Sequence, residues 1–80
     1  MDDPEILVDA RGHHCPVPTL KLRRALAAAP TGARLRLLTD DPLARIDVPH
    51  FLGEAASAVL SGVTEDLGVL SFAIVKQRPA

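Results

Sequence analysis

Segments with the period of a strand alternate along this chain with segments that have the period of a helix, and this order constrains the fold most. Residues 5–10 and 34–39 place apolar and polar side chains alternately, which is typical of strands with one buried face. Residues 16–29 are mostly helix formers, with apolar positions three and four residues apart. A strand, a helix and a strand in this order favour parallel pairing of the two strands.

A second helix is expected after an acidic turn. Residues 40–42, Asp-Asp-Pro, end the second strand. The helix is predicted to start at Val48 or Pro49, with Asp47 as its N-cap. Gly62 is expected to end it. The apolar residues at helical spacing that support this helix are Phe51, Ala55, Ala58 and Val59.

Two strands joined by a tight turn are predicted at the C-terminal end. Residues 63–67 and 69–76 have strand patterns, and Gly68 between them suits a hairpin turn. The full order, β-α-β-α-β-β, predicts an α/β (α+β) two-layer sandwich with a mixed four-stranded sheet and both helices on one face. All 80 residues, 1–80, are expected to form a single domain, because a chain this short has one small core.

The composition argues against several classes of function. A single cysteine forms no disulfide within the chain and cannot complete a zinc site that needs two thiolates. Two Phe residues without Trp or Tyr, and a net charge of −1, argue against direct binding of nucleic acid. The acidic start and the lack of a stretch of about 18 apolar residues indicate a cytoplasmic protein with no membrane contact. Nothing in the sequence demands more than a monomer.

The lone Cys15 lies where the first strand hands over to the first helix. Proline is tolerated in the first turn of a helix, so Pro16 and Pro18 place the helix start at or just after Cys15. The unpaired N–H groups and the dipole of that helix favour the thiolate and lower the pKa of the cysteine. Side chains that add positive charge nearby are Arg11, His13 and His14. A reactive cysteine is therefore favoured over a buried structural one.

Other polar residues have plainer interpretations. His13 and His14 adjoin Cys15 in sequence, and three consecutive ligands make poor tetrahedral geometry, so no metal site is predicted. His50 is the remote candidate for a catalytic base and is interpreted as an ordinary histidine. Turn chemistry and helix capping account for the acidic residues Asp40, Asp41 and Asp47. Two readings stay open for the basic residues Lys21, Arg23 and Arg24, a solvated helix face and a docking surface.

A family resemblance follows from these residues. Residues 7–18, LVDARGHHCPVP, together with Leu20 and the basic residues after it, resemble the Cys-Pro-x-Pro signature of the TusA (SirA-like) sulfur-carrier family. Residues 40–42 and 47–49 are similar to the family's Asp-Asp-Pro and Asp-Ile-Pro segments, and the resemblance covers the whole chain. His13 and His14 depart from the hydrophobic or basic residues expected at these positions.

The resemblance implies a sulfur carrier that acts with partner proteins. In this family the cysteine, here Cys15, accepts sulfane sulfur as a persulfide from a cysteine desulfurase or rhodanese-type donor and relays it to an acceptor protein. The pathways served include tRNA thiolation, molybdenum-cofactor maturation and sulfur oxidation. Pro16 and Pro18 carry over as the motif residues that set the helix start. Exchange at sulfur needs a thiolate and no metal or bound cofactor, so none is expected in this sulfurtransferase-like chain.

Two alternatives remain open at this point. The chain could be a non-catalytic regulatory or interaction module whose cysteine is a redox sensor or merely structural. An RNA-binding domain that uses Arg34 and Arg36 on the open face of the sheet is the weaker alternative.

Overall fold

The computed structural model describes residues 5–14, 17–55 and 57–78. Its helices and strands are, in chain order, β1 (Ile6–Asp9), α1 (Val17–Ala28), β2 (Arg34–Thr39), α2 (Ala44–Ala55), β3 (Ala58–Asp66) and β4 (Val69–Lys76). The predicted order of elements is confirmed. Neither of these two helices is long and apolar enough to cross a membrane.

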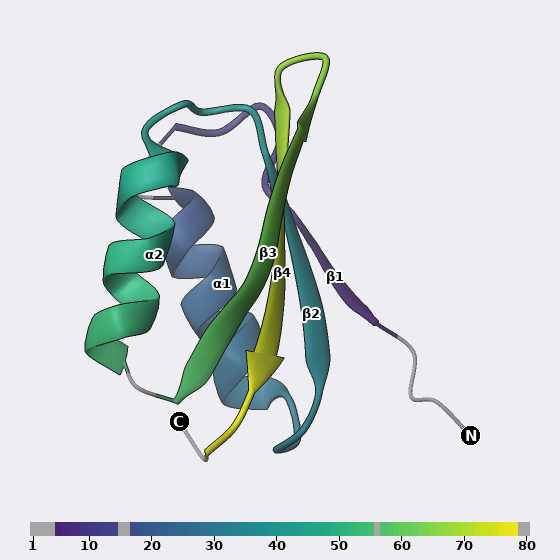
Figure 1. Ribbon diagram of the computed structural model, residues 1–80, viewed down its shortest axis with the longest axis vertical. Helices are drawn as coiled ribbons and strands as arrows, with labels where there is room; N and C mark the ends of the chain where they lie inside the picture. The colour runs from purple at the N-terminus through teal and green to yellow at the C-terminus, as the bar shows by residue number, and fades with distance from the viewer. Residues whose placement is uncertain (1–4, 15–16, 56, 79–80) are drawn as a thin grey trace.

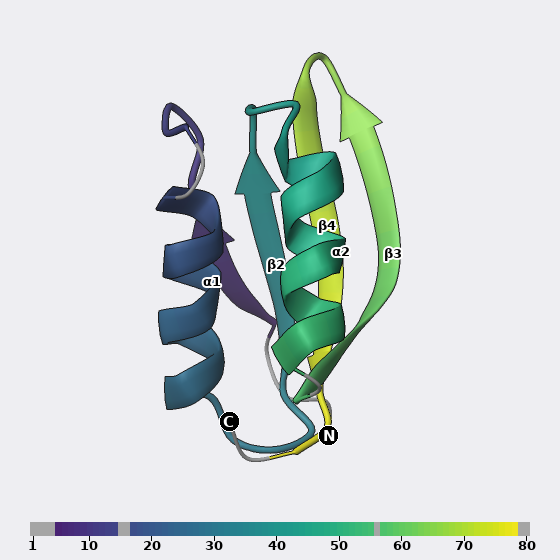
Figure 2. The same ribbon diagram turned by 90° about the vertical axis from the view of Figure 1, so that its left-hand side faces the viewer.

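The four strands form one mixed sheet in the order β1-β2-β4-β3. β1 pairs in parallel with β2, and β4 lies antiparallel to both β2 and β3. Both helices cover the same face of this sheet, so the predicted two-layer α+β architecture is confirmed (Figure 1). Because β1 and β2 run in the same direction, the ends of both strands meet the starts of both helices at one end of the molecule (Figure 2).

The core lies between the sheet and the helices. Alternate residues of the central strands face the helices and are buried, as Leu35, Leu37, Phe72 and Ile74 are. Burial of each side chain of this size stabilises the fold by about 1.5–3 kcal/mol. The buried helix residues are Pro18, Leu22, Leu26, Ala44, Val48 and Leu52. Leu20, which the sequence pattern placed in the apolar stripe of α1, is instead 52% exposed, since it lies two residues from Leu22 and so on the opposite side of the helix.

The start of α2 differs from its prediction. The helix begins at Ala44, four residues before Val48, and Asp47 lies inside its first turn where an N-cap cannot be. Residues 42–43 form a turn that leads into the helix, and Asp41 caps this turn, because its Oδ1 accepts a hydrogen bond from the N–H of Leu43 at 3.0 Å. The sequence contains two Asp and Pro pairings, and the structure uses the one that lets the helix start directly after β2.

The end of α2 also differs from its prediction. The helix ends at Ala55, whereas Gly62 was expected to end it, and Ala58 and Val59 belong to β3. The helical spacing of these small apolar residues is outweighed by pairing with β4, which extends along β3 from Ala58 to Asp66. A register shift between Leu60 and Gly62 explains why the alternation in β3 is hard to read from sequence.

The hairpin between β3 and β4 turns at Leu67 and Gly68, as predicted for Gly68. Both residues have positive φ, 51° for Leu67 and 81° for Gly68, which is the geometry of a two-residue turn that matches the strand twist. Leu67 is 96% exposed, so an apolar side chain stands at the tip of the hairpin.

The face of the sheet opposite the helices carries Arg34 and Arg36, as predicted. The Arg36 guanidinium donates hydrogen bonds to the Glu5 carboxylate at 2.8 Å and to the Ser71 hydroxyl at 2.6 Å. The charge of Arg36 is thus neutralised within the molecule, and both phenylalanines lie elsewhere, Phe72 in the core and Phe51 in α2. These contacts do not favour the RNA-binding alternative.

The end of the sheet opposite the α2 start is tied together by a buried lysine. Lys76, 4% exposed at the end of β4, donates hydrogen bonds to the carbonyls of Leu26 and Ala29 at 2.5 and 2.6 Å. α1 has no basic residue in its own last turn, so Lys76 supplies the positive charge that a helix C-terminus favours. This contact anchors α1 to the sheet.

Candidate functional site

Three connections gather at one end of the sheet, the β1–α1 loop, the β2–α2 loop and the β3–β4 turn (Figure 1). An ion pair between Arg45 of α2 and Glu65 of β3 links the last two. Residues 10–14, which precede the cysteine, therefore lie beside a second loop that is itself braced against the hairpin.

The β1–α1 loop is held by hydrogen bonds to the end of β2 and to the loop after it. The N–H of Ala10 donates to the carbonyl of Leu38 at 2.8 Å. The N–H of Gly12 donates to both carboxylate oxygens of Asp40, at 3.0 and 3.1 Å. Gly12 has φ of 82°, a conformation that side chains other than glycine disfavour. Asp40, interpreted from sequence as a turn residue, thus also clamps the neighbouring loop.

Cys15 and Pro16 lie outside the described residues, so the structure gives no geometry for the predicted reactive group. The residues on either side of them are hydrogen-bonded to each other, since the N–H of Val17 donates to the carbonyl of His14 at 2.9 Å. Pro18 is buried in the first turn of α1, as expected of a proline near a helix start. The structure gives α1 from Val17 onward, and the position of Cys15 at the helix start stays a prediction.

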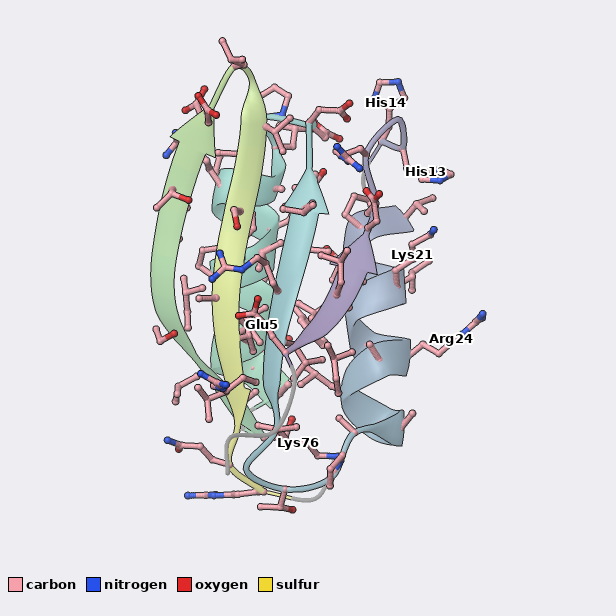
Figure 3. The ribbon with its side chains drawn as sticks, turned by 90° about the vertical axis from the view of Figure 1, so that its right-hand side faces the viewer. Glu5, His13, His14, Lys21, Arg24 and Lys76 are labelled. Carbon is pink, nitrogen blue, oxygen red and sulfur yellow. The ribbon has the colours of Figure 1, made fainter. Side chains whose placement is uncertain are left out.

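The two histidines before Cys15 are exposed to solvent. Their side chains point outward in different directions (Figure 3). His14 is 95% exposed, and its Nδ1 lies 4.0 Å from Oδ2 of the buried Asp41. Within residues 5–14, 17–55 and 57–78, no three His, Cys, Asp or Glu side chains are grouped as ligands of a metal ion.

Arg11 does not direct its charge toward the helix start. Its Nε and one terminal nitrogen donate to the Asp9 carboxylate at 2.9 and 2.7 Å. The backbone N–H of Arg11 donates to Asp9 Oδ1 at 3.1 Å. These side-chain and backbone hydrogen bonds hold the pKa of Asp9 well below its usual range. The same contact with Asp9 raises the pKa of Arg11. The pair stiffens the chain where it leaves β1.

The three basic residues of α1 separate into two groups. Lys21 and Arg24 extend from the same side of the helix, next to β1 (Figure 3), and Lys21 Nζ donates to the carbonyl of Asp9 at 3.4 Å. Arg23 points toward α2, with its guanidinium carbon 5.4 Å from the centroid of the Phe51 ring. The three basic residues therefore do not form one docking surface.

The remaining candidates take structural roles. Asp41 is 6% exposed and caps α2, as helix capping predicted for this group of residues. His50, the remote candidate base, is exposed in α2 and pairs with Glu54 one turn later, Nε2 to Oε1 at 2.5 Å. His50 is thus paired within its own helix, and the Asp41 carboxylate, whose Oδ2 lies 4.0 Å from His14 Nδ1, accepts the Leu43 N–H through Oδ1.

Sequence reasoning missed exposed apolar side chains around this end of the molecule. Leu43 and Ile46, at the start of α2, are 56% and 69% exposed, and Leu67 stands at the hairpin tip. The signal for Leu67 was present, because leucine is a poor choice for a hairpin turn position that needs positive φ. Leu43 and Ile46 gave no signal, since they were expected to precede the helix.

Comparisons with known proteins agree with one another. Residues 6–76 match the family described as Sulfurtransferase TusA. A protein of Archaeoglobus fulgidus named "Putative sulfur carrier protein" is 30% identical over 67 residues, which cover 84% of this chain and 87% of that protein. The crystal structure of the SirA-like protein from Desulfitobacterium hafniense superposes with a TM-score of 0.75 at 27% identity, covering 91% of this chain and 99% of that one.

Proposed function

This chain belongs to the TusA family of sulfurtransferases, and from that premise we propose that it is a sulfur carrier which holds sulfane sulfur as a persulfide on Cys15. The observation that carries the proposal is the sequence position of the only cysteine, between the exposed residues 11–14 and α1, which begins at Val17. The N-terminus of α1 stabilises a thiolate there. An exposed loop suits delivery of sulfur by one protein and removal by another.

The transfer is a thiol exchange that balances without an external oxidant or reductant. The Cys15 thiolate attacks the outer sulfur of a persulfide on the donor protein, and a new sulfur–sulfur bond forms on Cys15. The old bond breaks, and its electron pair leaves with the donor's thiolate. An acceptor thiolate then repeats the step on the loaded chain. The only cysteine of the chain cannot discharge its persulfide into an internal disulfide.

The partners we propose are a cysteine desulfurase or rhodanese-type donor and a downstream acceptor in tRNA thiolation, molybdenum-cofactor maturation or sulfur oxidation. The reducing cytoplasm, where thiols persist, is the compartment that suits this exchange. The exposed His13 and His14 stand beside the transfer position in sequence, where a docked partner would meet them. We propose that they contact the partner rather than act as a base, because the thiolate itself is the nucleophile.

Intact-protein mass spectrometry tests this function. Incubation with a cysteine desulfurase and cysteine, or with a rhodanese and thiosulfate, is expected to add one sulfur atom, about 32 Da, that dithiothreitol removes. The Cys15→Ser variant should gain nothing while keeping the circular dichroism of the wild type. No gain by the wild type with either donor would refute the carrier role.

Complementation separates the carrier from the regulatory-module alternative. A strain that lacks this gene should be rescued by the wild type and not by Cys15→Ser. Rescue by Cys15→Ser, with partner binding unchanged, would support the non-catalytic module and contradict the carrier.

A further inference from the structure

A shallow groove separates the edge strand β1 from α1. It has a volume of about 370 Å³, and most of its lining is aliphatic, including Ile6, Val8, Ala25 and Ala28. Lys21 and Arg24 stand on its helix side, and both extend from α1 toward solvent (Figure 3). The groove thus combines an apolar floor with two cations on one rim.

The groove continues toward the start of α1. A second depression of about 260 Å³ shares Lys21 and Arg24 with the first and is completed by Val17 and Leu20. Leu20 is the exposed apolar residue that the helical pattern had assigned to the core. The two depressions have Lys21 and Arg24 as a common border, and we call the first of them, which lies between β1 and α1, the β1–α1 groove.

The charge around the β1–α1 groove is positive. α1 contains three basic residues and no acidic one, although the whole chain has a net charge of −1. Arg23 is turned toward Phe51, so Lys21 and Arg24 are the cations that face the groove. The acidic residue in the lining, Asp9, has its carboxylate paired with Arg11. A negatively charged occupant is therefore complementary to this surface.

The shape of the groove favours an extended chain. β1 is an edge of the sheet, and its ladder to β2 uses the groups on one side of the strand, as the bond from Ala10 N–H to the Leu38 carbonyl shows. Alternation along the strand turns the backbone of Leu7 and Asp9 to the outer side. The contact of Lys21 Nζ with the Asp9 carbonyl agrees with this orientation. An extended peptide can pair with such an edge while alternate side chains enter the groove.

We propose that the β1–α1 groove binds an extended, acidic segment of the protein that exchanges sulfur with Cys15, a proposal that rests on the proposed function. Apolar side chains of that segment pack on Ile6, Ala25 and Ala28, and its carboxylates pair with Lys21 and Arg24. Because Lys21 and Arg24 also border the depression at Val17, a segment bound in the groove brings its parent protein close to the start of α1.

A peptide titration followed by NMR tests the groove. The probe is a short peptide of alternating glutamate and valine, added to ¹⁵N-labelled protein, with a peptide of alternating lysine and valine as its control. The acidic peptide should shift the amides of Leu7, Asp9 and Ala25, and added salt should weaken binding. The double variant Lys21→Gln/Arg24→Gln is expected to bind about tenfold more weakly, because two charge contacts are lost.

The control is Arg78→Gln, which removes one positive charge from an exposed residue outside the groove. It should change the affinity by less than about twofold, since a distant exposed charge is largely screened. Equal binding of both peptides, or shifts confined to other surfaces, or none at millimolar peptide, would overturn the groove proposal. A loss of affinity in Arg78→Gln equal to that of the double variant would do the same.

A second readout keeps this proposal separate from the carrier function. Inorganic polysulfide, which needs no docking, should load Cys15 equally in the wild type and in Lys21→Gln/Arg24→Gln. If the peptide does not bind but Cys15 loads, the groove proposal fails and the carrier function stands. If the peptide binds but none of the sulfur donors loads Cys15, the carrier function fails. The groove must then serve another partner, which overturns the proposal as stated.

Discussion

The two strand-to-helix connections of this protein occupy equivalent places, and they differ in whether the other connection helps to hold them. The β2–α2 connection closes on itself, since Thr39 Oγ1 accepts from the N–H of Asp41 at 3.2 Å and Asp41 Oδ1 accepts from the N–H of Leu43 at 3.0 Å. The β1–α1 connection also has internal bonds, from the N–H of Arg11 to Asp9 Oδ1 and from the N–H of His13 to the Ala10 carbonyl. In addition, the Asp40 carboxylate of the other connection holds it through the N–H of Gly12.

This difference indicates a structural role for the β2–α2 connection and a functional role for the β1–α1 connection. The β2–α2 connection satisfies its own backbone groups with the side chains of Thr39 and the buried Asp41, although Leu43 within it stays exposed. The loop before α1 keeps its side chains exposed, His13 and His14 among them, and lies beside the rigid connection that positions it. The acidic segment Asp40–Asp41 serves both loops, with one carboxylate for each.

The largest effect is expected at the N-cap of α2. Asp41→Ala removes the acceptor for the Leu43 N–H and should lower the free energy of unfolding by about 1–2 kcal/mol. Asp47→Ala is the matched control, because it removes an acid from the first turn without removing a cap, and should cost less than about 1 kcal/mol. Urea denaturation measures both. A larger loss in Asp47→Ala would restore the capping role predicted for that residue.

A smaller loss is expected at the turn of the β1–α1 loop. Gly12→Ala forces a Cβ onto a residue with φ of 82° and should lower the free energy of unfolding by about 1 kcal/mol. No atom lies within 4 Å of the added Cβ, so the cost is conformational alone. Gly53→Ala, in the exposed part of α2, has equal space and no positive φ, and should stabilise by about 0.5–1 kcal/mol. Equal effects in thermal denaturation would contradict this account of Gly12.

The link between the two connections is tested at Asp40. Asp40→Ala removes both acceptors of the Gly12 N–H and should destabilise the ordered loop by about 1 kcal/mol. The rate of sulfur loading should then fall roughly fivefold. The rate of mass gain with a desulfurase measures this. Unchanged loading would show that the clamp does not position the transfer site.

The smallest effect concerns the Asp9 and Arg11 pair at the base of the loop. Hydrogen bonds from Arg11 depress the pKa of Asp9 in the folded protein below the unfolded value of about 3.9. The stabilisation is therefore fully present above the unfolded pKa and is lost as pH falls through the folded one. The deficit of Asp9→Asn relative to the wild type should be constant from pH 7 to 5 and shrink below pH 4. Because the pair is exposed, the deficit is expected to be small. A deficit that stays constant down to pH 2, or the absence of any deficit at pH 7, would contradict this account.

Local patterns predicted much of the fold and of the site. The alternation in residues 34–39 and 69–76, and the prolines around Cys15, depend on neighbours within one turn or one strand, and the observed elements agree with them. The predicted start of α2 was wrong because Asp41 with Pro42 and Asp47 with Pro49 both suit a helix start, and local chemistry does not rank them. The strand Ala58–Asp66 was partly assigned to a helix, since its small apolar residues fit either period until β4 pairs with them.

The sequence by itself determined the order of elements, the helix start after Cys15 and the sulfur-carrier family, because each depends on residues close together in the chain. Only the tertiary structure decided which acid caps α2, that Asp40 holds Gly12, and that Lys21 and Arg24 face a groove while Arg23 faces Phe51. These choices depend on which surfaces the two layers bury against each other. Basic residues one or two positions apart on one helix acquire different roles only once a neighbouring strand and a neighbouring helix are in place.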